Sequence, residues 1–86
     1  MNKEVQDSVL SALSEYASPS VFQPNKLVEI NLADVVNDSL SLLEVVYDLE
    51  DKYKVMLQPE RLTELQTVAD LVNAIDQEVT TLSRRL

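Results

Sequence analysis

Apolar residues recur at helical spacing in three separate segments of this chain, and this pattern constrains the fold more than any other feature. The segments cover about residues 3–16, 38–53 and 67–80. In each of them apolar side chains return every three or four positions, which is the spacing of one face of an α-helix. Polar residues occupy most of the positions between. The pattern predicts an all-α fold built from three long amphipathic helices.

The connections between these segments carry recognisable start and stop signals. Pro19 is expected to end the first helix near Tyr16, because the residue before a proline is pushed out of the α region. Pro59 favours the first position of a short helix over about residues 59–65. Residues 81–86 are expected to form a tail. We therefore predict one four-helix domain over residues 1–86, with three long helices and one short helix.

The long connection over residues 17–37 has two interpretations. Val28, Ile30 and Leu32 alternate with polar residues, as they would in a strand whose partner would be residues 55–57. Alternatively, the connection is a packed loop whose apolar side chains cover the end of a helical bundle. We favour the packed loop, because a strand with so little to pair with is poorly supported.

Composition excludes several classes of function. The 86 residues include 7 Lys and Arg against 15 Asp and Glu, so the net charge is −8, and the chain has no His, Cys or Gly. Without His or Cys it has no common general base, no thiol nucleophile and no usual zinc ligands. Without Gly it cannot build a phosphate-binding glycine loop. The acidic balance argues against nucleic acid as a partner. We expect neither catalytic residues nor a metal site.

The chain shows no targeting or membrane signal. Acidic residues occupy the N-terminal positions where an export signal would need apolar ones, and no stretch approaches the ~18 apolar residues of a membrane span. With 45% hydrophobic residues, the chain is also too apolar to be disordered. These observations predict a cytoplasmic domain that does not insert into membranes, and we take a monomer as the default state.

The tripeptide Asp38-Ser39-Leu40 stands at the start of the second predicted helix. Asp38 or Ser39 can serve as the helix N-cap, and this structural interpretation needs no further function. The acidic residues that follow form either a solvated face or a surface for binding a partner. The context is more specific than the tripeptide, because an acidic amphipathic helix follows a long loop near the middle of a short acidic chain.

At this point the sequence resembles the acyl carrier proteins. The segment Val35–Tyr53 is similar to the Asp-Ser-Leu motif and second helix of that family, including the aromatic residue that closes the helix. The residues Thr67, Val68, Ala69, Leu71, Val72 and Ile75 are similar to the start of its last helix. The order of long helix, long loop, long helix, short turn and helix is also that of the family.

The resemblance implies that Ser39 is the attachment point of 4′-phosphopantetheine, moved from coenzyme A by a phosphopantetheinyl transferase, with Asp38 in a supporting role. The thiol of that arm would carry an acyl group as a thioester to acyl-transferring and chain-elongating enzymes of fatty-acid or polyketide type. A protein without Cys can do thiol chemistry when a cofactor supplies the thiol.

The resemblance also assigns two sets of side chains on and around the second helix. The first set would meet basic docking patches on partner enzymes: Leu40, Glu44, Tyr47, Asp48, Glu50 and Asp51. The second set would surround an acyl chain inserted between helices: Leu42, Leu43, Val46, Leu62, Leu65, Val68 and Ile75. Plain core packing would equally explain the second set.

One position departs from the family pattern. Carrier proteins usually have glycine two residues before the aspartate, where this chain has Val36. Either this backbone position does not need a positive φ, or the loop that enters the helix is reshaped. Two alternatives to the acyl carrier stay open: a carrier of aminoacyl or peptidyl groups, and an acidic helical interaction module that never carries a cofactor.

Overall fold

The computed structural model describes residues 3–17, 22–36 and 38–85, and this part of the chain is helical with no strand. The long helices are α1 (Lys3–Leu13), α3 (Ser39–Tyr53) and α5 (Val68–Arg85). The short segments are the 3₁₀ helix η2 (Pro24–Glu29), α2 (Leu32–Val35) and α4 (Pro59–Leu62). The predicted all-α fold with three long helices is confirmed.

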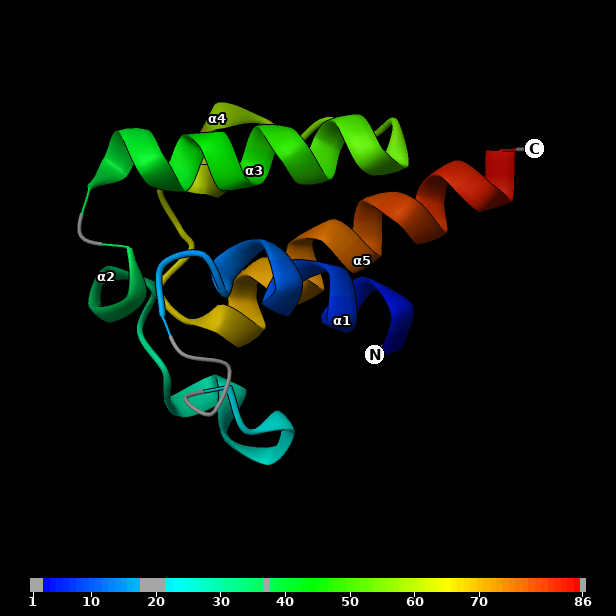
Figure 1. The fold of residues 1–86 in the computed structure, drawn as a ribbon. Coiled ribbons are helices and arrows are strands. Elements are labelled where there is room, and N and C mark those ends of the chain that lie inside the picture. The colour runs from blue at the N-terminus through cyan, green and yellow to red at the C-terminus, as the bar shows by residue number, and fades with distance from the viewer. Residues whose placement is uncertain (1–2, 18–21, 37, 86) are drawn as a thin grey trace.

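The three long helices pack their apolar faces together. α1 contacts both α3 and α5, and η2 packs against α5, while α2 lies near the start of α3 (Figure 1). The side chains buried most completely are Val5, Val9, Leu13, Val46, Val68, Leu71, Val72 and Ile75. None of the helices in the described part of the chain is long and apolar enough to cross a membrane.

Several helix ends differ from the prediction. α1 ends at Leu13, and residues 14–16 form a turn instead of continuing the helix to residue 16. α4 is likewise shorter than the predicted 59–65. The predicted tail is wrong for residues 81–85, because α5 continues to Arg85. Val79 packs against the core and the half-buried Leu82 lies one turn further along, so the apolar stripe of α5 extends past residue 80.

The long connection is a packed segment that contains η2 and α2. Leu27 and Leu32 are buried in the core, and Ile30 packs against it. Val28 is 69% exposed, so the prediction that it covers the bundle is wrong. The 3₁₀ helix turns three residues at a time, and this period places Leu27 inward and Val28 outward. The strand interpretation is also wrong for the described residues.

Two backbone hydrogen bonds attach this connection to the start of α5. The N–H of Val68 donates to the carbonyl of Ile30 at 2.9 Å, and the N–H of Leu32 donates to the carbonyl of Gln66 at 2.8 Å. They form an isolated antiparallel bridge between Asn31 and Thr67. The bridge fixes the entrance to α2 against the entrance to α5.

A polar contact joins α1 to the carboxyl end of α3. The buried Ser8 hydroxyl lies 2.6 Å from the Tyr53 hydroxyl, and the Lys52 ammonium donates to the same Ser8 oxygen at 2.9 Å. Burying a hydroxyl without a partner would cost about 1–3 kcal/mol, and these bonds remove that cost.

The end of α3 is formed by a lysine in the left-handed conformation. Lys54 has φ 56° and ψ 43°, and its N–H donates to the carbonyl of Glu50. Glycine is the usual residue at this position, since a side chain there costs roughly 1 kcal/mol or more. The side chain of Glu50 accepts from the N–H of Leu57 at 2.7 Å, which holds the chain as it leaves the turn.

The start of α5 is capped reciprocally. The hydroxyl of Thr67 accepts from the N–H of Asp70 at 3.1 Å, and the Asp70 carboxylate accepts from the N–H groups of Thr67 and Gln66, each at 3.1 Å. These backbone donors, Thr67 before Gln66, hold the pKa of Asp70 below its ordinary value of 3.8. The arrangement is a capping box with aspartate in place of glutamate.

We predict that Asp70→Ala lowers the free energy of unfolding by about 1 kcal/mol at pH 7. Because folding lowers the pKa of Asp70, its contribution is fully present above pH 3.8 and is lost as the pH falls through the folded value. Urea denaturation of the wild-type protein and Asp70→Ala between pH 7 and pH 2.5 should therefore show a difference in the free energy of unfolding that decreases in acid.

Asp76→Ala is the matched control, because it removes a carboxylate from the middle of the same helix. It should change stability by less than about 0.5 kcal/mol at pH 7. A gap for Asp70→Ala that persists undiminished at pH 2.5 would show that the carboxylate charge does not stabilise the cap.

Candidate functional site

The start of α3 is capped by Asp38. This residue is extended, with φ −112° and ψ 124°, and its Oδ1 accepts from the N–H of Leu40 at 3.1 Å. Its Oδ2 accepts from the hydroxyl of Ser41 at 3.4 Å. The sequence did not decide whether Asp38 or Ser39 is the N-cap, and in the structure the N-cap is Asp38.

Ser39 is the first residue of α3. The residues on either side of it, Asp38 and Leu40, are both exposed, so this helix end faces solvent. A helix start presents backbone N–H groups without intrahelical partners and the positive end of the helix dipole. The backbone therefore presents residue 39 at a place suited to a phosphate group.

Val36 has an ordinary backbone conformation. Its φ of −122° and ψ of 100° lie in the extended region, and its N–H donates to the carbonyl of Leu32 at 2.8 Å. Its side chain is 5% exposed and belongs to the core. Of the two possibilities raised by the sequence, this position has no need of a positive φ. The valine instead anchors the loop that leads to Ser39.

One exposed stripe runs along α3. Leu40, Glu44, Tyr47 and Asp51 follow one another at intervals of four, three and four residues, so they share a face of the helix. Leu40 is 63% exposed and Tyr47 is 58% exposed. Asp48 is exposed beside them. We call Leu40, Glu44, Tyr47 and Asp51 the α3 stripe.

Glu50 is placed differently from the other predicted docking residues. It is half-buried, and its carboxylate bonds the backbone of Leu57. Asp51 also has a partner within the chain, because Lys54 lies 3.3 Å from its carboxylate. Both side chains of that pair are largely exposed, so the ion pair is weak and can be exchanged for another partner.

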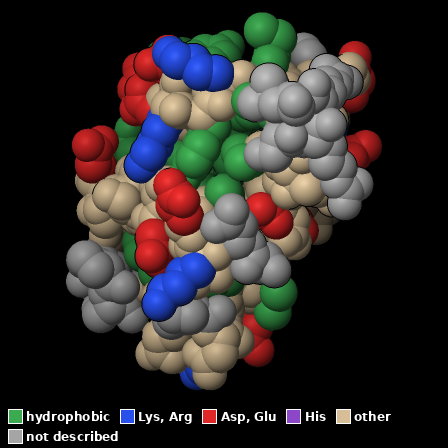
Figure 2. All heavy atoms as spheres, turned by 90° about the vertical axis from the view of Figure 1, so that its right-hand side faces the viewer, with side chains coloured by type: hydrophobic (Ala, Val, Ile, Leu, Met, Phe, Trp, Pro, Cys, Tyr) green, Lys and Arg blue, Asp and Glu red, His purple; other side chains and the backbone are tan. Residues whose placement is uncertain are grey.

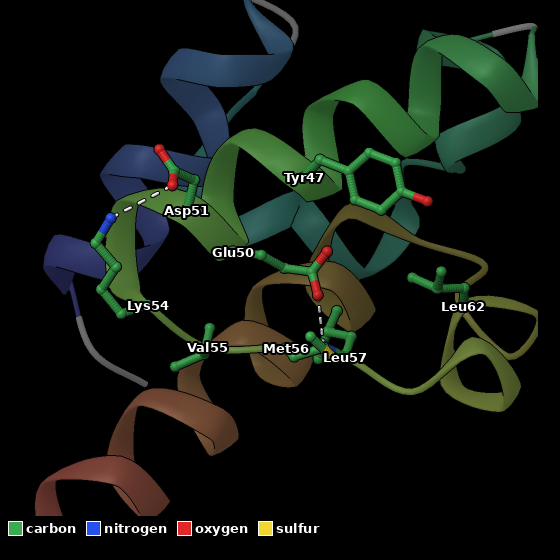
Figure 3. Close-up of a pocket in the computed structure, with 8 residues that line it drawn as sticks. All are labelled: Tyr47, Glu50, Asp51, Lys54, Val55, Met56, Leu57 and Leu62. Carbon is green, nitrogen blue, oxygen red and sulfur yellow. Dashed lines mark hydrogen bonds and ion pairs between the residues drawn. The ribbon is translucent and has the colours of Figure 1, made fainter.

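The residues predicted to surround an acyl chain are not all together. Val46, Val68 and Ile75 are fully buried in the core, and Leu43 is half-buried. Leu42 and Leu65 line a groove of about 490 Å³, together with Val36 and Leu32. Leu62 lines a separate groove of about 620 Å³ near the other end of α3 (Figure 3). The first groove adjoins the segment that contains Ser39, because Val36 and Leu42 flank it in sequence.

The region around the start of α3 matches a known protein family. The family model for the phosphopantetheine attachment site matches residues 24–75, more than half of the chain. This range includes the connection from residue 24 onward, all of α3, and α5 as far as Ile75.

Relatives with the name "Acyl carrier protein" match over most of the chain. The one from Kocuria rhizophila is 30% identical over 74 residues, which cover 83% of this chain and 91% of that protein. The one from Campylobacter fetus is 36% identical over 73 residues, which cover 85% and 88%. A third, from Exiguobacterium sibiricum, is 39% identical over 46 residues, and the match spans only 58% of that protein. No solved structure matches the chain significantly.

This chain belongs to the family of phosphopantetheine attachment domains. Its relatives within that family are acyl carrier proteins. Members of this family carry 4′-phosphopantetheine as a covalent cofactor and have no catalytic activity of their own. The family membership removes the interaction module without a cofactor from the alternatives. The cargo is a separate question.

We predict that Val36→Gly destabilises the protein by about 2–4 kcal/mol. The substitution removes a buried apolar side chain and gives the unfolded chain more freedom, while the observed φ offers glycine no advantage. Urea denaturation, followed by the helical circular dichroism signal, measures this difference.

Val36→Ala separates the two contributions, since it loses most of the side chain but keeps a restricted backbone. Its free energy of unfolding should lie between those of the wild-type protein and Val36→Gly. A glycine variant more stable than the wild type would contradict the extended conformation of this residue.

Proposed function

We propose that this protein is an acyl carrier whose Ser39 bears the 4′-phosphopantetheine arm, and that it presents acyl thioesters to biosynthetic enzymes of the fatty-acid or polyketide type in the cytoplasm. The observation that carries the proposal is the position of Ser39 at an exposed helix start within the matched attachment domain. The N-cap role is filled by Asp38, the residue before Ser39.

In the loading step, the Ser39 hydroxyl would attack the β-phosphorus of coenzyme A, that is, the phosphorus next to the pantetheine. A phosphodiester bond to Ser39 forms, and the bond from the β-phosphorus to the oxygen that bridges the two phosphates breaks. Adenosine 3′,5′-bisphosphate leaves, and the serine hydroxyl loses its proton. The transferase supplies Mg²⁺ for this step. Once attached, the arm supplies the thiol that this cysteine-free chain lacks.

The helix start supports the phosphodiester after loading. Free backbone N–H groups and the helix dipole would stabilise its charge by about 0.3–1 kcal/mol at an exposed position. Asp38 already accepts from Leu40, so its carboxylate is held beside Ser39. We assign Asp38 the supporting role of fixing the helix start during loading.

Partner enzymes would dock on the α3 stripe and Asp48. Leu40 and Tyr47 provide apolar contacts, and Glu44 and Asp48 provide exposed negative charge for basic patches. Charges at the edge of an interface increase the rate of encounter more than they increase affinity. A shuttle benefits from this balance, because it must leave each enzyme as readily as it binds. We leave Glu50 out of this surface, because its carboxylate is bonded to Leu57.

The groove lined by Leu42 and Leu65 is the place where we propose that an acyl chain is sheltered. It is mostly apolar, and Val36 in its lining belongs to the loop that leads to α3. Val46, Val68 and Ile75 would contact such a chain only if the helices moved apart, because they are fully buried in the core.

An aminoacyl cargo is the second candidate, favoured by Val36 at a position where many acyl carriers have glycine.

We predict that the purified protein gains the mass of one phosphopantetheine group when it is incubated with coenzyme A, Mg²⁺ and a broad-specificity phosphopantetheinyl transferase. Ser39→Ala should gain none, since it lacks the attacking hydroxyl. Intact mass spectrometry measures both outcomes.

Ser41→Ala is the matched control, because it removes a neighbouring hydroxyl from the same turn of α3. It should load fully. Loading of Ser39→Ala, or failure of the folded wild-type protein with several transferases, would contradict the assignment of Ser39.

We also predict that removing charge from α3 slows loading. The double variant Glu44→Gln with Asp48→Asn should lower kcat/KM of the transferase by about threefold to tenfold at low salt, because electrostatic steering is reduced. The difference from wild type should shrink as salt is raised.

The control variant, Glu15→Gln with Glu29→Gln, changes the net charge by the same amount at exposed positions away from α3. It should load nearly as fast as wild type. An equal decrease in both double variants would assign the effect to net charge and not to the α3 surface.

A further inference from the structure

The groove near the start of α3 combines an apolar part with a polar part. Its apolar part comes from Leu32 and Val36, which are buried, and from Leu42 and Leu65, which are half-buried. Its volume of about 490 Å³ lies within the ~300–1,000 Å³ that is usual for small-molecule sites. Leu42 follows Ser39 by three residues in α3, about 4.5 Å along the helix axis. An arm attached to Ser39 therefore begins within one helical turn of the groove lining.

The polar part consists of three side chains that the fold does not use. Asn31, Asp34 and Gln66 line the groove and are exposed. Among the described residues, the carboxylate of Asp34 and the side-chain amides of the other two have no hydrogen-bond or ion-pair partner. A group that displaces water from them must replace the hydrogen bonds that water made.

Backbone hydrogen bonds hold this polar part in place. The N–H of Leu32 donates to the carbonyl of Gln66 at 2.8 Å, as part of the bridge between Asn31 and Thr67. The N–H of Asp34 donates to the carbonyl of Asn31 at 3.0 Å. The backbone under the three side chains is thus positioned before a ligand arrives, which lowers the entropic cost of binding.

The charge of the groove is negative. None of the described residues that line it is basic. Asp34 carries a carboxylate, and Asp70 adds a second one beside Gln66, because it accepts from the Gln66 N–H at 3.1 Å. In contrast, Figure 2 shows basic side chains among acidic ones on the face at the right of Figure 1, away from α2. The groove therefore repels an anionic acyl group and attracts a cationic one.

A plain saturated acyl chain suits only the apolar part of the groove. It would pack on Leu42 and Leu65, but it has no donor for Asp34 or for the amide oxygens of Asn31 and Gln66. Covering these polar groups without a partner is unfavourable. A protonated amine has three donors, so it can bond the carboxylate and an amide oxygen together.

We propose that this groove receives the cargo end of the arm, and that Asp34 selects acyl groups that combine an apolar carbon skeleton with a protonated amine. The proposal rests on the proposed attachment of the arm to Ser39, and it names the class of acyl group that the carrier holds. An aminoacyl group with a branched aliphatic side chain is the simplest member of that class. Asp34 acts here as a specificity-determining residue that contacts the cargo.

The test compares leucyl and 4-methylpentanoyl cargoes, which differ only in the amino group. Each is joined to the arm by an amide bond in place of the thioester and is loaded from the matching coenzyme A analogue. At pH 6 the α-amine is protonated. The ratio of folded to unfolded protein, measured by urea denaturation at low salt, should be about threefold higher for the leucyl form, because only the folded protein offers the groove.

Asp34→Asn should abolish the difference between the two cargoes, since it keeps the size of the side chain and removes its charge. Asp7→Asn is the matched control, because Asp7 is an exposed aspartate of α1, which contributes no residue to this groove. It should leave the difference unchanged. Each comparison is made between two cargoes on the same variant, so a change in the variant's own stability cancels.

Three results would overturn the proposal. They are equal stability of the leucyl and 4-methylpentanoyl forms, an equal decrease of the difference in Asp34→Asn and Asp7→Asn, and a succinyl cargo that shifts the NMR signals of Leu42 and Leu65 as much as the leucyl cargo does. Intact mass spectrometry confirms loading before any of these measurements. A failure to load would contradict the proposed function, whereas these three results contradict only the role of Asp34 and its groove.

Discussion

The two backbone hydrogen bonds between the long connection and the start of α5 determine where the candidate site lies. They hold Ile30 and Leu32 against Gln66 and Val68. From this fixed point the chain makes one turn of α2, buries Val36 and enters α3 at Asp38. The bridge and the buried side chain of Val36 together fix the path of the connection to the helix that begins with Ser39. The capped start of α5 therefore supports a site that is distant from it in sequence.

α3 divides its two faces between stability and recognition. Val45, Val46 and Leu49 are buried in the core, while the α3 stripe faces solvent. The polar contact of Ser8 with Tyr53 and Lys52 fixes the far end of the helix to α1. The helix is thus held near both ends, and partners would meet a surface whose shape is already set.

The sequence was sufficient for the features that depend on local pattern. Helical periodicity predicted the three long helices, and the residues around Asp38 predicted a helix start at about residue 38, one residue before the observed start. Features that depend on distant partners were missed. The alternation of Val28, Ile30 and Leu32 has the period of a strand, yet a 3₁₀ helix begins at Pro24 and turns Val28 outward. Glu50 had the pattern of a surface acid, and only the left-handed turn at Lys54 brings Leu57 within its reach.

The absence of glycine has a consequence for the chain before it folds. Glycine samples more backbone conformations than any other residue, so a chain without it has fewer unfolded states to give up. The left-handed turn at Lys54 is the described place where the folded state accepts strain as a result. A small helical core can then hold a unique structure with less apolar burial than a glycine-rich chain of equal length would require.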